Sequence, residues 1–257
     1  MTKIIRIGLA QIQTTLNKQK NNRSIVEAIK KAVEQKVDIL VFPEASQISF
    51  EANLKDEAEL LDGAFARLIR SQASENNMLI VAGMFEPAEN GRVYNTLLIT
   101  GKNVEACYHK VHLYDAFGAR ESDIVAAGDS YLTLDTVFGK IGFATCYDLR
   151  FAEQFTALAR EGAKLIIVAA SWGDGPGKAE QWNLLVRARA SDAQAWLAGC
   201  DQAWQPSTTT APLGIGLSCI IDPTGMVRAR LASSPGLLVY DVDLDYVDTI
   251  RTRIPIL

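Results

Sequence analysis

The sequence predicts an α/β protein built in layers, with helices outside and β-sheets inside. Apolar runs typical of strands alternate with amphipathic helical patterns, and each half of the chain ends in strands that form hairpins. Some of these apolar runs contain no alternating polar residues, which indicates strands covered on both faces. No linker rich in proline, glycine or serine interrupts the 257 residues, so we expect one domain over residues 1–257.

The first half of the chain is predicted to contain five strands and two helices. A strand at 4–12 precedes an amphipathic helix over about 17–36, and Val37–Phe42 forms the next, buried strand. A second helix is expected over about 56–75, with five apolar residues on one side: Leu60, Leu61, Phe65, Leu68 and Ile69. Three further strands follow, separated by turns at Asn90-Gly91 and Gly101-Lys102-Asn103: Met78–Gly83, Tyr94–Thr100 and Val104–His109.

The second half repeats this alternation. A strand at Ile141–Thr145 is followed by a helix over 151–161, and a strand at Lys164–Ala170 is followed by a helix over about 178–194. The remaining elements are strands, at Trp196–Ala203 and near 216–221, 226–231 and 237–242. Residues 110–130 and 171–178 have loop composition and are longer than a connection requires, so we expect these loops to surround a site.

Charge and apolar content exclude two classes of partner. The chain has 26 basic and 30 acidic residues, a net charge of −4, and no block of one sign, so nothing predicts binding to nucleic acid. No apolar run approaches the ~20 residues that span a bilayer, and the amino-terminal segment does not resemble a signal peptide. Four scattered cysteines, at 107, 146, 200 and 219, are typical of reduced thiols. We therefore expect a cytoplasmic protein.

Three reactive side chains follow the ends of three predicted strands. Cys146 follows an apolar run, as do Glu44 and Lys110. Open α/β sheets place their chemistry at the carboxyl ends of strands, so these groups are positioned to share one pocket. A thiol, whose pKa is ordinarily about 8.5, needs a base or a nearby cation before it can attack at neutral pH. The combination favours acyl transfer through a covalent thioester.

The segments around these residues resemble the nitrilase superfamily of carbon–nitrogen hydrolases. The order of glutamate, lysine and cysteine is the family's, with Lys110 66 residues after Glu44 and 36 before Cys146. The resemblance covers nearly the whole chain. Its main motifs are Phe42-Pro43-Glu44, His109-Lys110-Val111-His112-Leu113 and Thr145-Cys146-Tyr147-Asp148-Leu149-Arg150-Phe151. Further matches include Tyr94-Asn95-Thr96, Glu121-Ser122, Trp182, Arg187-Ala188-Arg189-Ala190 and Asp222-Pro223-Thr224-Gly225.

The resemblance implies a role for each matched residue. Cys146 would be the nucleophile, Glu44 the general base and acid, and Lys110 the group that stabilises the oxyanion. The Tyr147 N–H would be a second oxyanion donor, and Glu121 would help to place the substrate, unless it is an ordinary loop carboxylate. The implied fold is an αββα sandwich with two mixed β-sheets flanked by helices. The family usually dimerises through its helices, so a homodimer or a dimer-based oligomer is expected.

The turn that begins at Cys146 is most similar to the branch of omega-amidases and deaminated-glutathione amidases. That similarity implies hydrolysis of a small linear amide, the ω-amide of a short carboxylic or dicarboxylic acid, to acid and ammonia without a cofactor or metal. One alternative is N-carbamoyl amine hydrolysis by the same three residues. An alternative of another class is a catalytically silent scaffold that binds a metabolite.

Residues near the predicted site are candidates for contacts with the substrate. Four are aromatic and two are basic: Phe50, Tyr114, Phe117 and Trp172, with Arg150 and Lys178. The aromatic residues are equally compatible with ordinary packing. For Arg150 we favour an ion pair with Asp148 over a substrate contact, and for Lys178 we favour a solvated surface position. His109 and His112 are three residues apart and would point to opposite faces of an extended chain, with no Cys-x-x-Cys nearby. We therefore expect no metal site.

Overall fold

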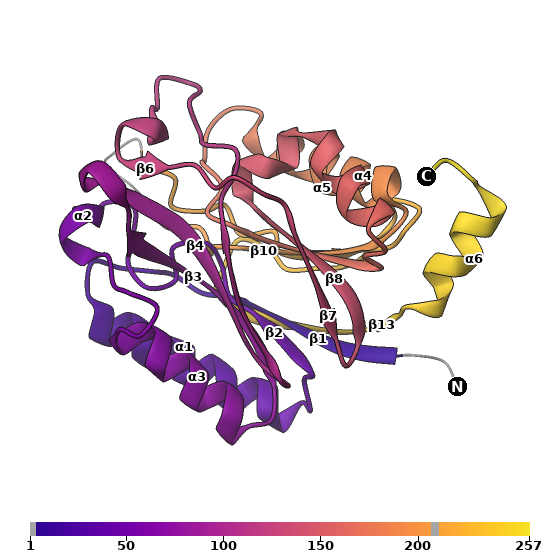
Figure 1. Cartoon of the computed structure of the whole chain (residues 1–257), viewed down its shortest axis with the longest axis horizontal. Coiled ribbons are helices and arrows are strands. Elements are labelled where there is room, and N and C mark those ends of the chain that lie inside the picture. The colour runs from indigo at the N-terminus through magenta and orange to yellow at the C-terminus, as the bar shows by residue number, and fades with distance from the viewer. Residues whose placement is uncertain (1–3, 207–210) are drawn as a thin grey trace.

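A computed structural model describes residues 4–206 and 211–257 and shows four layers (Figure 1). Helices α1 (Lys18–Glu34) and α3 (Ala64–Glu75) cover one face, and helices α4 (Ala152–Arg160) and α5 (Lys178–Ala193) cover the opposite one. Two β-sheets lie face to face between these helix pairs. The fold is therefore the expected αββα sandwich.

The first sheet carries two of the three reactive side chains. Its strands run in the order β13-β1-β2-β3-β4-β5, with β6 (Val125–Ala126) added beside β4. The bounds are β1 (Ile4–Gln11), β2 (Ile39–Val41), β3 (Leu79–Pro87), β4 (Val93–Gly101), β5 (Val104–His109) and β13 (Gly236–Asp243). Strands β1, β2 and β3 are parallel, and the other neighbours along this path are antiparallel. Glu44 and Lys110 follow β2 and β5.

The second sheet carries the thiol. Its order is β12-β11-β10-β9-β8-β7, with β8, β9 and β10 parallel at its centre. The bounds are β7 (Leu132–Thr136), β8 (Gly139–Thr145), β9 (Leu165–Ala170), β10 (Trp196–Asp201), β11 (Cys219–Ile221) and β12 (Val227–Arg230). Cys146 follows β8, so the three reactive residues come from two different sheets.

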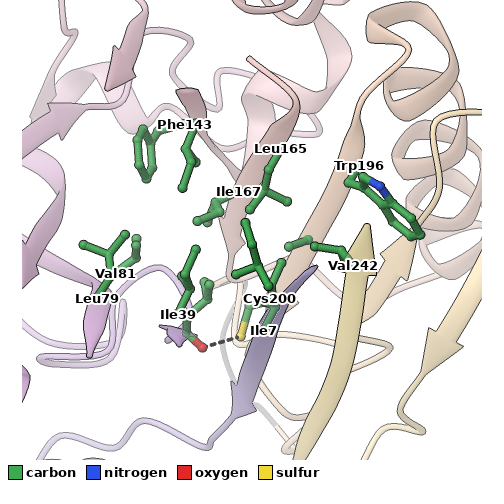
Figure 2. Packing of buried hydrophobic residues seen from close by; sticks show 14 of the residues in the cluster. Ile7, Ile39, Leu79, Val81, Phe143, Leu165, Ile167, Trp196, Cys200 and Val242 are labelled. Carbon is green, nitrogen blue, oxygen red and sulfur yellow. Dashed lines mark hydrogen bonds between the residues drawn. The ribbon is translucent and has the colours of Figure 1, made fainter. Parts of the chain in front are cut away.

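Alternating residues of the central strands face two different apolar layers. On β9, Leu165 and Ile167 point toward the first sheet, whereas Ile166 and Val168 point toward α4 and α5. Figure 2 shows Ile7, Ile39, Leu79 and Val81 packed between the sheets against Phe143, Leu165, Ile167 and Trp196. The Cys200 thiol reaches across to the carbonyl oxygen of Val41, 3.3 Å away. Burial on both faces explains why these strands are apolar throughout.

The helix predicted over 56–75 is wrong as a single element. A short helix, α2 (Leu54–Glu57), ends first, and residues 58–63 run outside a helix before α3 begins. The Glu59 carboxylate accepts a hydrogen bond from the Phe65 N–H at 2.9 Å, which caps α3, and it also pairs with Lys18 at 2.9 Å. Leu60 is 61% exposed instead of buried. A tertiary contact from α1 therefore overrides an otherwise continuous helical pattern.

Four other elements differ from the predictions. Strands β6 and β7 and helix α6 (Asp245–Arg253) were not expected, and β6 lies inside the segment predicted as a loop. Strand β13 does not extend the second sheet but pairs antiparallel with β1 in the first. Helix α6 extends beyond the four layers (Figure 1). Arg251 joins it to the body by donating to the Ala163 and Ala193 carbonyls. No helix within the described residues is long and apolar enough to cross a membrane.

Gly83 lies where β3 passes the chain segment that carries Glu44. A Cβ atom at Gly83 would lie 2.6 Å from the Glu44 Cα and 2.6 Å from the Pro43 carbonyl oxygen. We expect Gly83→Ala to destabilise the protein by about 1–3 kcal/mol, because the backbone beside Glu44 must move. It should also lower the amide hydrolysis that the resemblance implies by more than the loss of stability explains, as measured by chemical denaturation and by ammonia release.

Gly236→Ala is the matched control, since its added Cβ would lie 3.5 Å from the Leu231 side chain, an ordinary contact. Equal activity of the Gly83→Ala and Gly236→Ala proteins would show that the Gly83 contact does not position Glu44.

Candidate active site

The Lys110 ammonium lies between two carboxylates in the interior of the protein. Its Nζ is 3.0 Å from Glu44 Oε1 and 2.9 Å from Glu121 Oε2. Lys110 is 2% exposed and Glu44 is fully buried. A buried ammonium is tolerated only when it is paired and hydrogen-bonded, and here two carboxylates satisfy that condition. The structure thus places Glu121 in contact with Lys110, as the resemblance implied.

Two further groups fix the Glu44 carboxylate. Asn95 on β4 donates from Nδ2 to Glu44 Oε1 at 2.7 Å and to Glu121 Oε1 at 3.1 Å. The Ser171 N–H, just beyond β9, donates to the other oxygen of Glu44 at 2.8 Å. Both oxygens of Glu44 are therefore hydrogen-bonded, which holds the carboxylate in one orientation.

The Cys146 thiol lies beside this charged group. Its Sγ is 3.8 Å from the carbonyl oxygen of Ser171, the residue whose N–H binds Glu44. Cys146 begins a 3-10 helix, η3 (Cys146–Arg150), with a left-handed φ of 46°. Non-glycine residues adopt this conformation at an energetic cost, and such strain concentrates at functional sites. The tight turn directs the thiol into the same cavity as Glu44 and Lys110.

Burial and mutual charge set the protonation of these groups. Burial raises the pKa of the Cys146 thiol well above its ordinary value, and the nearby Glu44 carboxylate raises it further. Burial also raises the pKa of Glu44, against the opposing effect of Lys110. For Lys110, burial lowers the pKa, but Glu121 and Glu44 outweigh it and hold the pKa well above the ordinary lysine value. The site therefore holds an ammonium and a protonated thiol, which needs a base before it can attack.

Asp148 connects the Cys146 turn to the segment that carries Lys110. Its buried carboxylate accepts from the Thr145 N–H at 2.8 Å and from the Tyr108 hydroxyl at 2.7 Å. It also accepts from the His112 N–H at 3.0 Å, and His112 Nδ1 lies 2.8 Å from the same oxygen. Because Tyr108 and His112 lie two residues to either side of Lys110, one carboxylate fixes the Cys146 turn relative to the end of β5.

A cavity of about 510 Å³ opens above the three reactive groups. Five of the six predicted contact residues line it, together with Tyr147: Phe50, Tyr114, Arg150, Trp172 and Lys178. Phe117 is an exception, because it is 69% exposed and lines a neighbouring hollow instead. It lies at a turn where both Phe117 and Gly118 have left-handed backbone, and its ring covers Lys178 Nζ at 3.5 Å. A cavity of this size suits a small organic molecule.

Of the four cationic residues that line this cavity, Lys110, Arg120, Arg150 and Lys178, the last two were predicted to contact the substrate. The expected ion pair between Arg150 and Asp148 is wrong, because Asp148 is occupied by Thr145, Tyr108 and His112. Arg150 instead donates to Gln181 at 2.6 Å, and its buried Nε has no hydrogen-bond partner within the described residues. The idea that Lys178 is an ordinary solvated residue is also wrong, since it is only 9% exposed and donates to the Tyr114 hydroxyl at 3.2 Å.

Sequence reasoning assigned no role to three residues that organise the site. Asn95 is a fully buried polar residue on a mostly apolar strand, and that pattern was a usable signal. Asp148 was visible in the motif, but its partners Tyr108 and His112 are distant in sequence. Ser171 acts through its backbone, and a backbone contact leaves no mark in the side-chain sequence.

Comparison with known proteins identifies the family. Residues 6–252 match the family model described as carbon-nitrogen hydrolase. The chain belongs to this family. As a carbon–nitrogen hydrolase, it is an enzyme that acts on carbon–nitrogen bonds other than peptide bonds, in agreement with the resemblance noted in the sequence.

Relatives and solved structures cover almost the whole of this hydrolase. A protein of Mycobacterium tuberculosis, named only as a hydrolase, is 40% identical over 98% of this chain and 94% of its own length. A deaminated glutathione amidase of Escherichia coli is 33% identical over 98% of this chain and 95% of its own.

An amidase variant from Nesterenkonia sp. AN1 has a solved structure with a TM-score of 0.80 and 25% identity, over 98% of this chain and 95% of that one. That structure shows covalent addition of the acetamide moiety of fluoroacetamide at its active-site cysteine.

The carboxylate of Glu121 affects the protonation of Glu44, because its negative charge adds to the effect of burial in raising the pKa of Glu44. In the role of general base that the resemblance implies, Glu44 must be deprotonated, so we expect activity to be lost as the pH falls through this raised pKa. We expect Glu121→Gln to shift the acid limb of kcat/KM to lower pH and to reduce the maximal rate, as measured by ammonia release across pH.

Asp123→Asn is the control, because Asp123 lies in the same 3-10 helix, η2 (Glu121–Asp123), with its side chain 62% exposed. An acid limb that stays in place in Glu121→Gln, or moves equally in both variants, would contradict the proposed coupling between Glu121 and Glu44.

Proposed function

We propose that this carbon–nitrogen hydrolase converts a small linear amide to a carboxylic acid and ammonia through a thioester on Cys146. The proposal rests on the buried Glu44–Lys110 pair and the Cys146 thiol lining one cavity, with Ser171 hydrogen-bonded to both the thiol and the Glu44 carboxylate. It supplies a nucleophile, a base and a fixed positive charge within one water-poor site.

In the first half of the proposed reaction, Glu44 takes the thiol proton as Cys146 attacks the amide carbonyl carbon. The negative charge that develops on the carbonyl oxygen is stabilised by Lys110 and by the Tyr147 N–H. Glu44 then delivers its proton to the leaving nitrogen, the carbon–nitrogen bond breaks, and ammonia departs. The acyl group remains on sulfur as a thioester.

In the second half, Glu44 removes a proton from a water molecule that attacks the thioester carbonyl. The same two donors stabilise the second oxyanion, the carbon–sulfur bond breaks, and the proton on Glu44 returns to the thiolate. The raised pKa of Glu44 suits both roles, because a carboxyl group must accept and release a proton near neutral pH.

The cavity favours a substrate that carries a negative charge at the end remote from the amide. Arg150 and Lys178 line it, and no salt bridge joins either cation to a carboxylate of the described residues. Phe50 and Trp172 supply apolar walls suited to a short carbon chain. We therefore propose an ω-amide of a dicarboxylic compound, which agrees with the names of the amidase relatives.

An ammonia-release screen tests the reaction. ω-Amides of dicarboxylic acids, neutral amides of equal length, N-carbamoyl amines and nitriles are compared, with the Cys146→Ala protein as blank. We expect turnover of the amides, an acyl-enzyme detectable by mass spectrometry on Cys146, and no turnover by the blank. Release of ammonia by the Cys146→Ala protein, or turnover of carbamoyl amines alone, would refute the proposal.

The same screen tests the charge preference. Arg150→Gln should raise KM for a carboxylate-bearing amide by roughly tenfold, the equivalent of one charge-assisted hydrogen bond, and leave KM for the neutral amide unchanged. Arg160→Gln, at the end of α4 and outside the cavity lining, provides a control for loss of positive charge. Equal effects on both substrates would remove the proposed role of Arg150.

We also propose that the chain forms a homodimer, as the family resemblance implied. Helix α5 carries Leu184 on its outer side, and this side chain is 66% exposed. A pair of helices packed against its copy would bury such a residue. Light scattering should give twice the chain mass of 28.1 kDa, and a monomeric mass at micromolar concentration would contradict the proposal.

A further inference from the structure

A second group of reactive side chains lies on the helix-facing side of the first sheet, outside the cavity. Cys107 and His109 are two residues apart on β5, so they point to the same face of the strand. Glu86 on β3 lies across β4 from them. The potential metal-ligand atoms of Glu86, Cys107 and His109 all lie within 4.8 Å of one another. Within residues 4–206 and 211–257, this is the one such group of three His, Cys, Asp or Glu residues.

Neighbouring side chains orient the members of this group. His109 Nε2 is 3.0 Å from Glu86 Oε2, and the imidazole ring stacks on Tyr94 with centroids 4.0 Å apart and planes 3° apart. The Thr96 hydroxyl donates to the same Glu86 oxygen at 2.8 Å. Partners of this kind fix the ring and carboxylate of metal ligands in known sites. The Cys107, His109 and Glu86 side chains are therefore held close together before any ligand arrives.

We propose that Glu86, Cys107 and His109 bind a zinc ion. The donor set consists of one thiolate, one imidazole nitrogen and one carboxylate oxygen, all of which are common zinc ligands. Zinc accepts them in a tetrahedral arrangement, with water in the fourth position. A thiolate with an imidazole favours zinc over magnesium or calcium, which prefer oxygen ligands alone.

Partial exposure gives the ion a route to the site. The side chains of His109 and Glu86 are 30% and 12% exposed, and Cys107 is a half-buried free thiol. On binding, zinc replaces the thiol proton of Cys107 and any proton on the coordinating nitrogen of His109, and these protons leave to solvent.

The proposed ion would join the middle of the sheet to the strand that carries Lys110. Glu86 lies on β3, whereas His109 is the residue directly before Lys110. A ligand set on β3 and β5 would brace β4 between them, and β4 contributes Asn95 to the active site. The site is chemically separate from Cys146, which lies in the second sheet's turn.

Cobalt(II) substitution tests the site without relying on activity. The full chain carrying Cys146→Ala is titrated with cobalt, so that the active-site thiol does not contribute. We expect one equivalent per chain, a near-ultraviolet band from thiolate to cobalt, and displacement by zinc. Adding Cys107→Ser should abolish the band. His109→Gln should weaken zinc binding by at least roughly 10–100-fold, because even the loss of a residue that only supports a metal ligand has an effect of that size.

Glu105→Gln is the matched control, because Glu105 lies on the same face of β5 but outside the group, with its side chain 52% exposed. It should keep the cobalt band. A band that persists in Cys107→Ser, or no saturable binding in the parent, would overturn the proposal. If a variant fails to fold, iodoacetamide labelling of the unsubstituted chain decides: one equivalent of zinc must slow modification of Cys107, and unchanged labelling overturns the site.

Discussion

The pairing of the Lys110 ammonium with Glu44 and Glu121 is the interaction on which the rest of the site depends. Lys110 and Glu44 are buried and the Glu121 side chain is 9% exposed, and breaking a buried pair by removing one partner costs about 3–5 kcal/mol, because an uncompensated charge remains. The protein therefore has to build a polar interior around them. Asn95 and Ser171 complete that interior with hydrogen bonds to Glu44. The same arrangement that makes these charges tolerable also orients them toward the thiol.

The two sheets have to keep a fixed position relative to each other for this chemistry. Glu44 and Lys110 come from the first sheet and Cys146 from the second, so a small sliding of the sheets would separate them. The apolar layer between the sheets opposes sliding because its side chains interdigitate (Figure 2). Asp148 adds a directional constraint, since it binds the Cys146 turn together with Tyr108 and His112, which lie two residues to either side of Lys110. Packing and hydrogen bonding thus act together to position Cys146.

The fold was predictable from the sequence where the pattern of apolar residues reflects burial. It was not predictable where contacts between residues distant in sequence determine the structure. Strands such as Leu165–Ala170 are apolar because both faces are covered, so composition alone revealed them. The break before α3 depends on Glu59, which caps that helix while it pairs with Lys18 on α1. Helix α6 carries two buried residues, Val247 and Ile250, too weak a pattern to predict a helix. The pairing of β13 with β1 joins opposite ends of the chain, which no local pattern specifies.

At the site, the amino-acid sequence establishes which chemical groups are present and that each of them follows a strand. Glu44, Lys110 and Cys146 were identifiable because polar residues directly after apolar runs emerge at the edge of a sheet. The contacts of these groups, and the cations that have no carboxylate partner, depend instead on the folded arrangement. Asp148 binds His112 instead of Arg150, and that choice leaves the Arg150 side chain facing the cavity. The physical reason is that charge and hydrogen-bond pairing depend on distances in space, and residues 36 apart in sequence lie in contact here.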